Sequence, residues 1–220
     1  MNLILPLDKP YGWSSFDAIR YVQRIIRKKA DGERFKIGHA GTLDPLATGL
    51  LLICIGKATK QSESLQAGQK EYVAEVCFGA TTVSYDLETE PIPTPNAPTV
   101  SRKQLEMELQ KMLGEQLQMP PRFSAKQIDG QRAYELARKG IDVDVKRSLI
   151  NIYELQLLEF DYPYAKILIR CSKGTYIRTF AHDLGNALGC GAYLSGLRRT
   201  ASGNFTILQS VSIEKLNDML

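Results

Sequence analysis

The stretch Lys36–Gly56, KIGHAGTLDPLATGLLLICIG, determines how this chain is organised, because it joins a glycine-rich polar loop to an apolar segment. Its single acidic residue, Asp44, lies between Gly41 and Gly49, and glycines let a backbone approach a ligand closely. The run Leu50–Ile55 is long enough for one buried strand. Loops that hold polar side chains against a rigid strand often carry chemistry. We therefore expect Asp44 to be functional.

The dipeptide Asp44-Pro45 also has a second interpretation. Asp is a favoured N-cap and Pro is a favoured first helical residue, so the pair alone predicts a helix start. His39, taken alone, is typical of a structural histidine that is hydrogen-bonded in place. The local pattern therefore leaves both a functional loop and a helix start open.

Composition bounds the class of protein. The 220 residues are 44% hydrophobic, which suits one large domain or two small ones. The 28 Lys and Arg against 24 Asp and Glu give a net charge of +4, which is compatible with nucleic acid without requiring it. The cysteines show no zinc spacing, and we interpret them as reduced thiols of a cytoplasmic protein: Cys54, Cys77, Cys171 and Cys190. Neither a signal peptide nor a membrane-spanning run is expected.

Hydrophobic periodicity predicts a mixture of strands and helices without a regular βαβ alternation. Strands are predicted over 2–6, 50–55, 71–78, 149–160, 165–171 and 192–199. Helices are predicted over 15–29, 100–113, 175–188 and 213–219, with a helix or long turn over 57–67. This mixture indicates an α+β fold with an antiparallel sheet.

Two segments carry clustered cations. The helix over 15–29 has an apolar side at Phe16, Ile19, Val22, Ile25 and Ile26. Its other side and end are basic, which fits a solvated face slightly better than a stripe that contacts RNA. Residues 119–147 interleave Arg and Lys with Phe123 and Tyr134, which suits RNA or an exposed arm. Within them, a strand is predicted around 122–128 and a helix around 131–139.

Several motifs together carry a family resemblance. They are GHAGTLDPLATGLL around Asp44, KEYVAEVCFG around Tyr72, PPRFSAKQIDGQRAYELARKG from Pro120, CSKGTYIRTFAHDLG from Cys171 and LRRTASGNF from Leu197. In this order they resemble the bacterial tRNA pseudouridine synthase B family, whose members make pseudouridine at position 55 of the tRNA T-loop. The resemblance covers nearly the whole chain.

The resemblance implies a fold and a set of site residues. The fold would be the pseudouridine synthase fold, a bent and mainly antiparallel mixed sheet with flanking helices and a central cleft, in a single catalytic domain over 1–220. Asp44 would be the essential aspartate, Arg178 its partner, and Tyr72 the tyrosine that packs against the target base. Tyr176 and Leu197 would contact the target nucleotide, and His39 would fill the gap left in the T-loop. Residues 119–147 would be an arm that clamps the RNA.

The chemistry of this isomerisation is compatible with one carboxylate. The C1′–N1 bond of uridine breaks, the uracil turns, and C1′ joins C5, so no cofactor or metal is required. Asp44 could attack C1′, add to C6 or take a ribose proton, and each route needs an ionised carboxylate in a dry pocket. The implied partner is the T-arm of tRNA, bound with the target base flipped out by a monomeric enzyme without a membrane.

Two departures and two alternatives accompany the resemblance. Val83 stands where the family usually has an acid, although Asp86 follows, and this departure argues against the family's usual contact of the 81–86 loop with RNA. The small C-terminal RNA-binding domain of many relatives is expected to be absent. A non-catalytic RNA-binding or RNA-folding module is one alternative function, and a nucleosidase, which usually needs two carboxylates, is the other.

Overall fold

The apolar run after the Asp44 loop forms strand β3 (Ala47–Ile55), which is buried along most of its length. It pairs antiparallel with β1 (Leu3–Lys9) and β2 (Ile37–Ala40), and in parallel with β12 (Ala192–Ser202). A strand with apolar residues facing both ways has to be covered on both faces, which explains its continuous hydrophobic sequence.

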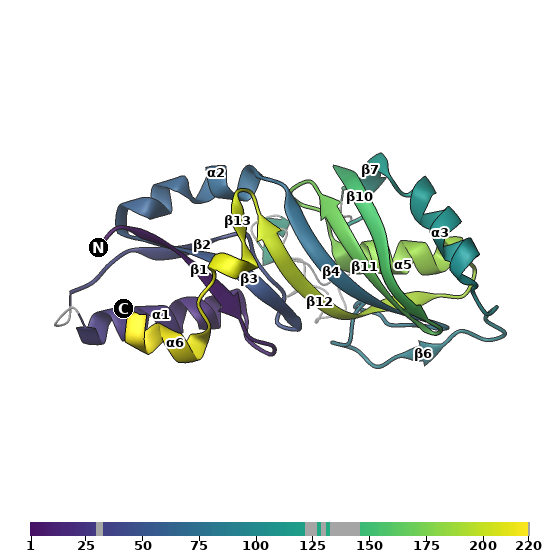
Figure 1. Ribbon diagram of the computed structural model, residues 1–220, viewed down its shortest axis with the longest axis horizontal. Coiled ribbons are helices and arrows are strands. Elements are labelled where there is room, and N and C mark those ends of the chain that lie inside the picture. The colour runs from purple at the N-terminus through teal and green to yellow at the C-terminus, as the bar shows by residue number, and fades with distance from the viewer. Residues whose placement is uncertain (30–32, 122–126, 129–130, 133–145, 220) are drawn as a thin grey trace. The chain divides into compact units, whose positions relative to one another are not determined.

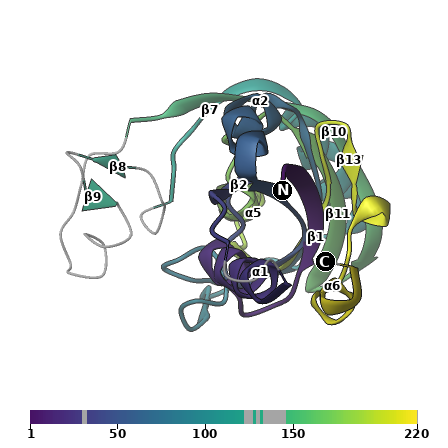
Figure 2. The same ribbon diagram turned by 90° about the vertical axis from the view of Figure 1, so that its left-hand side faces the viewer.

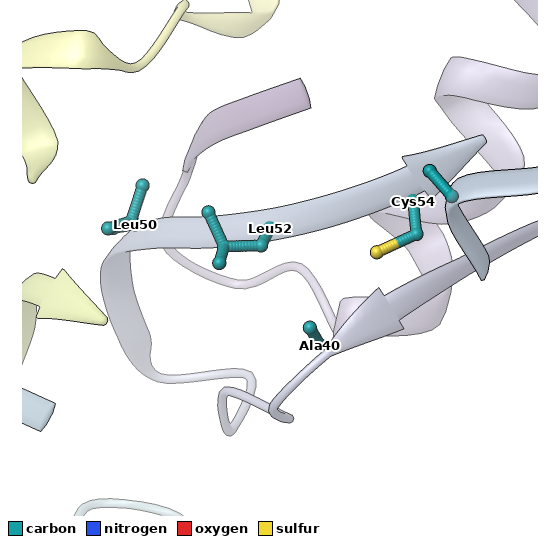
Figure 3. Packing of buried hydrophobic residues seen from close by; sticks show 5 residues of the cluster. Ala40, Leu50, Leu52 and Cys54 are labelled. Carbon is teal, nitrogen blue, oxygen red and sulfur yellow. The ribbon is translucent and has the colours of Figure 1, made fainter. Parts of the chain in front are cut away.

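Alternate residues of β3 anchor the strand in an apolar cluster. Leu50, Leu52 and Cys54 are fully buried and pack with Ala40 of β2 and with Ala58. Figure 3 shows Leu50, Leu52 and Cys54 along β3 with Ala40 beside them. Because successive side chains of a strand point to opposite faces, this cluster lies on one face of β3. Burial of each leucine side chain contributes about 2 kcal/mol, so the strand gives the Asp44 loop a firm base.

The start of β3 approaches β12 so closely that only glycine fits. Gly49 has a φ of +100°, and a Cβ there would lie 2.4 Å from the carbonyl oxygen of Arg199. Gly49 and Arg199 are register partners in the parallel pair of β3 and β12. Because Gly49 has no side chain, the backbone of Arg199 can pack directly against the end of the loop that carries Asp44.

The structure is a computed structural model that describes residues 1–29, 33–121, 127–128, 131–132 and 146–219 (Figure 1). The chain forms two compact units. Unit 1 comprises Met1–Val73 and Leu197–Leu220, and unit 2 comprises Ala74–Gly196. Strand β12 and strand β4 (Lys70–Phe78) contribute residues to both units. The single catalytic domain expected from the sequence stays a prediction.

Helices flank the strands of unit 1. Besides the strands already named, its elements are α1 (Ser15–Lys29), η1 (Gly56–Gln61), α2 (Ser62–Ala67), β13 (Phe205–Thr206), η2 (Ile207–Gln209) and α6 (Ile213–Met219). Both α1 and α2 contact β2, and α6 contacts β1. Figure 2, in which this unit faces the viewer, shows α1 and α2 on opposite sides of it.

Unit 2 is built on a sheet in which β10 pairs antiparallel with both β11 and β7. Its strands follow the order β4-β11-β10-β7, and two short pairs, β5-β6 and β8-β9, lie outside it. The elements are β5 (Ala80–Thr81), β6 (Ile92–Pro93), α3 (Arg102–Lys111), β7 (Gly114–Gln118), β8 (Gln127–Ile128), β9 (Gln131–Arg132), β10 (Ser148–Asp161), β11 (Tyr164–Cys171) and α5 (Ile177–Ala187). The hairpin expected from the sequence is confirmed by β10 and β11.

The structure confirms the α+β class with a mixed, mainly antiparallel sheet, in which the β3–β12 pair is parallel. Of the two interpretations of Asp44-Pro45, the structure shows the loop and not the helix start, because residues 45–46 form a turn and β3 begins at Ala47. Strand pairing overrides the local preference of Asp-Pro for a helix start. Phe16 was expected in the core and is 61% exposed, since the buried face of α1 centres on Ala18 and Val22.

Two further differences concern polar segments. Gly114–Gln118 forms the strand β7, which hydrophobic periodicity does not indicate because most of its side chains are polar. Most of the arm expected over 119–147 lies outside the described residues. The helix predicted around 131–139 does so as well, apart from Gln131–Arg132, which pair with Gln127–Ile128 as strands β9 and β8.

Candidate active-site loop and its surroundings

The loop between β2 and β3 holds Asp44 at a partly exposed position, with its backbone fixed on both sides. Before it, the Leu43 amide donates to Ser15 Oγ at 2.9 Å, and the same hydroxyl donates to the Leu43 carbonyl at 3.0 Å. After it, the Gly12 amide donates to the Pro45 carbonyl at 2.9 Å. The loop is therefore fastened to the first residue of α1 and to the turn that precedes this helix.

Lys9, at the end of β1, is a buried cation next to the same loop. Its side chain has no exposed surface, and its Nζ donates to the carbonyls of Trp13 at 2.6 Å, Pro10 at 3.0 Å and Pro45 at 3.4 Å. Burial lowers the pKa of Lys9 to about 8; the negative charge of Asp44 opposes this shift, and Arg199 adds to it. Lys9 therefore places a titratable positive charge against the Asp44 loop.

We expect the stability of the protein relative to a Lys9→Met variant to rise with pH between about 8 and 10.5. In this range the folded state has released the Lys9 proton while the unfolded chain still holds it, so raising the pH favours folding. Urea unfolding of both proteins from pH 7 to 10.5 measures this difference. Lys57→Met, at an exposed position of η1, is the control. A difference that stays constant or shrinks as pH rises would contradict the assignment.

Arg199 spans the Asp44 loop from β12. It is 1% exposed, and its Nε donates to the Leu50 carbonyl at 2.7 Å, its Nη2 to the Gly41 carbonyl at 3.1 Å and its Nη1 to the Thr42 carbonyl at 3.4 Å. These acceptors lie on both sides of Asp44 in the sequence. A buried guanidinium is tolerated when its donors are paired. Arg199 thus fixes the width of the loop that presents the carboxylate.

Three other predicted site residues lie in unit 1, namely Leu197, Tyr72 and His39. Leu197 is the register partner of Ala47, and its carbonyl accepts from Thr48 Oγ1 at 3.3 Å, so it flanks the end of the Asp44 loop. Tyr72 is buried on β4 with 8% exposure.

His39 lies on β2, opposite Ile53 of β3. Burial, with a smaller contribution from Arg199, lowers the pKa of His39, so the ring is neutral at pH 7. Its buried Nδ1 has no hydrogen-bond partner among the described residues.

The other two predicted residues, Arg178 and Tyr176, lie in unit 2. Arg178 forms a buried ion pair with Asp86. Arg178 Nε lies 3.6 Å from Asp86 Oδ2, with side-chain exposures of 5% and 6%, and Arg178 Nη1 donates to the Ser84 carbonyl at 3.4 Å. The Glu88 amide also donates to Asp86 Oδ1 at 3.0 Å. Val83 of the same loop is exposed. The acid of this loop therefore faces Arg178 while the position usually acidic in the family faces solvent.

Tyr176 is the N-cap residue of α5 and is held through its backbone. Its amide donates to Gln118 Oε1 at 2.8 Å, and its carbonyl accepts from Gln118 Nε2 at 3.0 Å. One residue into α5, Arg178 is buried. Gln118 thus ties the end of β7 to the start of α5, which Tyr176 precedes and in which Arg178 lies.

Reasoning from the sequence missed three members of these surroundings: Lys9, Arg199 and the Asp86 partner of Arg178. Lys9 and Arg199 pair mainly with backbone carbonyls, and such pairing leaves no pattern of complementary residues in the sequence. Asp86 was noted as the acid that follows Val83, but nothing in the sequence pairs it with Arg178. In the part of the chain that the structure describes, no three His, Cys, Asp or Glu side chains are grouped as metal ligands would be.

Two further expectations concern the cysteines, expected to be reduced thiols, and membrane-spanning segments, of which none was expected. All four cysteines are free and buried, as expected from their spacing. No helix of the described residues is long and apolar enough to cross a membrane.

Comparison with known proteins gives a consistent result. A family model described as TruB family pseudouridylate synthase (N terminal domain) matches residues 24–177, and one described as tRNA pseudouridylate synthase B C-terminal domain matches 178–220. The chain is 46% identical over 217 residues to tRNA pseudouridine synthase B of Phocaeicola vulgatus, covering 99% of this chain and 92% of that protein. It is 43% identical over 219 residues to the protein of the same name in Solibacter usitatus, covering 73% of that protein.

Solved structures share the fold. A Cbf5-Nop10-Gar1 complex contains a chain with a TM-score of 0.74 and 27% identity, and an H/ACA ribonucleoprotein bound to a substrate RNA containing 2′-deoxyuridine contains one with a TM-score of 0.71 and 26% identity. Each match covers 98% of this chain, which spans about half of the matched chain, 53% and 52%.

Proposed function

Because the chain belongs to the TruB family of pseudouridylate synthases, we propose that it isomerises uridine to pseudouridine in tRNA, at uridine-55 of the T-loop. The observation that carries the proposal is the family match over residues 24–220, together with 46% identity over 217 residues to a tRNA pseudouridine synthase B. The Asp44 loop supports it, since Lys9, Ser15 and Arg199 fix the backbone around one partly exposed carboxylate.

In the proposed reaction, Asp44 is the catalytic carboxylate. The C1′–N1 bond breaks, the C1′–C5 bond forms, the hydrogen on C5 leaves as a proton, and N1 ends with a proton, so the atoms balance without a second substrate. Fixed loop geometry favours such a reaction because the carboxylate is already oriented and little reorganisation is needed. The positive charge of Lys9 favours the ionised form of Asp44.

Arg178 is proposed to be the second charge partner of Asp44. Two observations support this role: the guanidinium of Arg178 is buried, and it forms an ion pair with Asp86. The ion pair fixes the orientation of the guanidinium within unit 2. A buried guanidinium held on one side by a carboxylate keeps donors in a fixed fork for a second anion. Asp86 is then a positioning residue that acts through Arg178.

We expect Arg178→Ala to lower the rate of pseudouridine formation by about a hundredfold or more, because a fixed charge at the reacting centre is lost. The affinity for tRNA should stay near that of the parent. Single-turnover rates and filter binding measure the two quantities. Arg170→Ala, which removes an exposed partner of Glu154, is the control and should be nearly neutral.

Because Arg178→Ala leaves Asp86 buried without its cation, Arg178→Lys is measured beside it to separate charge from folding. Partial recovery of rate by lysine is expected. Near-parental turnover of a folded Arg178→Ala protein would exclude the proposed role.

The remaining predicted residues are proposed to receive the flipped T-loop nucleotide. Tyr72 offers a flat face for the uracil, while Leu197 and Tyr176 wall the pocket. His39, whose neutral ring keeps an unpaired Nδ1, is proposed to fill the gap that the base leaves in the T-loop. Residues 119–147 are proposed as the arm that clamps the RNA. We further propose that the enzyme acts as a monomer in the cytoplasm, which its four buried free thiols support.

A balance of products separates this function from the alternatives. A tRNA transcript labelled in its uridines is incubated with the protein, and pseudouridine and free uracil are measured together. Pseudouridine without free uracil is expected. Free uracil would indicate a nucleosidase, and tRNA binding with neither product would indicate a non-catalytic RNA-binding module.

A further inference from the structure

The exposed face of α1 is a dense group of cations. Its exposed basic residues are Arg20, Arg24, Arg27, Lys28 and Lys29. The single acid of the helix, Asp17, is paired with Arg20. Cations in the last turn are explained by the helix dipole, but Arg20 and Arg24 lie in the middle of the helix, where that effect has faded. A solvated helix end therefore does not account for the whole face.

This face lines two hollows that share Arg20 and Arg24. The larger, of about 750 Å³, also involves Arg27, Lys28 and Arg34, and Glu33 is the single carboxylate in its lining. The smaller, of about 490 Å³, begins at Gly12 and Trp13. We call the two together the α1 groove. The larger part of the groove is lined by four arginines and one lysine but by only one carboxylate. This concave surface is therefore strongly positive.

Aromatic rings lie among these cations. Phe16 is 61% exposed with the Arg20 guanidinium 5.1 Å from its ring centre. Trp13 and Tyr21 both line the smaller hollow. Their rings pack edge to face, with 5.3 Å between the ring centres. Guanidinium groups bind phosphate through paired hydrogen bonds, and exposed aromatic faces stack on bases or riboses. This combination is typical of a surface that contacts single-stranded or looped RNA.

The α1 groove begins at the Asp44 loop. Gly12, at its near end, donates to the Pro45 carbonyl, and the Trp13 carbonyl accepts from Lys9. Ser15, the first residue of α1, is hydrogen-bonded to Leu43. A helix rises about 1.5 Å per residue, so the basic face leads away from the Asp44 loop over roughly 20 Å, several nucleotides of backbone.

We propose that the α1 groove binds the sugar-phosphate backbone of the substrate tRNA where it leads away from the target nucleotide. This inference rests on the proposed function, because it takes the Asp44 loop as the place where the target lies. Arg24 and Arg27 contact phosphates, and the exposed Phe16 ring supports the strand beside them. The groove contributes affinity rather than chemistry, since it lies outside the loop that carries Asp44.

The double variant Arg24→Glu/Arg27→Glu tests the proposal. Its Kd for tRNA should rise by about tenfold to a hundredfold, and the slope of log Kd against log salt should fall by about two, one for each lost phosphate contact. The single-turnover rate at saturating enzyme should fall much less than the affinity, because Asp44 and the loop that carries it are not altered. Arg24→Lys/Arg27→Lys, which keeps the charges, should recover most of the affinity.

The matched control is Arg102→Glu/Lys103→Glu, which makes the same change of charge on the exposed face of α3 in unit 2. It should change the Kd and the salt slope by less than half as much. Equal losses in both double variants would mean that only net charge matters and would overturn the proposal. So would an unchanged Kd in the α1 variant, the result expected if the groove serves an acidic protein instead.

The two proposals fail in different ways. If the parent makes pseudouridine in tRNA but the α1 variants bind as the parent does, the docking surface is wrong and the function stands. If the parent makes no pseudouridine in tRNA, the proposed function fails, whatever the binding data show.

Discussion

Replacement of Asp44 by asparagine is expected to reduce pseudouridine formation by at least about a thousandfold, because the amide has the shape of the carboxylate but neither its charge nor its basicity. The backbone around position 44 is held by Ser15, Gly12 and Arg199, so the loop should keep its form. Affinity for tRNA should change little. Single-turnover assays and filter binding measure both quantities.

The control for this variant is Asp161→Asn, at an exposed end of the β10–β11 hairpin, which should act as the parent does. A variant Asp44→Asn that retains more than a tenth of the parental rate would show that the carboxylate is not central to the reaction. Loss of folding, detected by circular dichroism, would instead show that the loop depends on the charge.

The second large effect is expected on stability. Arg199→Met should lower the free energy of unfolding by about 4 kcal/mol, because a buried guanidinium is lost and its three carbonyl acceptors, of which that of Leu50 is buried, lose their donor at once. Urea unfolding measures this change. At temperatures where the variant stays folded, its rate of pseudouridine formation should also fall, since Arg199 sets the width of the Asp44 loop.

The neighbouring arginine provides a matched control. Arg198 pairs with Asp8 at 2.7 Å, with side-chain exposures of 42% and 30%, so Arg198→Met should cost less than about 1 kcal/mol. If Arg198→Met and Arg199→Met destabilise the protein equally, the buried hydrogen bonds of Arg199 do not have the importance assigned to them.

The strands and helices were largely predictable because their hydrophobic periods are clear. Helix α1 begins at Ser15 and ends at Lys29 as expected, and the continuous apolar run Leu50–Ile55 does form a buried strand. The local Asp-Pro signal left a helix start at Asp44 open, and it could not exclude it because the strand pairs with β1, β2 and β12 are set by distant residues. The prediction that Phe16 is buried failed because helical spacing alone does not show where the buried face of a helix ends.

The site was predictable only in part, for a physical reason. Asp44 was singled out by its loop, and Leu197, named from the resemblance, lies beside the end of that loop, while its contact with the target nucleotide stays a prediction. The buried cations Lys9 and Arg199 were not found because their acceptors are backbone carbonyls, which every residue has. Asp86 was noticed, but nothing local to the sequence connects it with Arg178, which lies far along the chain.

Position-resolved detection of pseudouridine in a tRNA transcript tests the central claim most directly. After incubation with the parent protein, modification is predicted at the T-loop uridine alone, and after incubation with Asp44→Asn at no position. Pseudouridine at other uridines only, or an equal yield from the variant, would contradict the account.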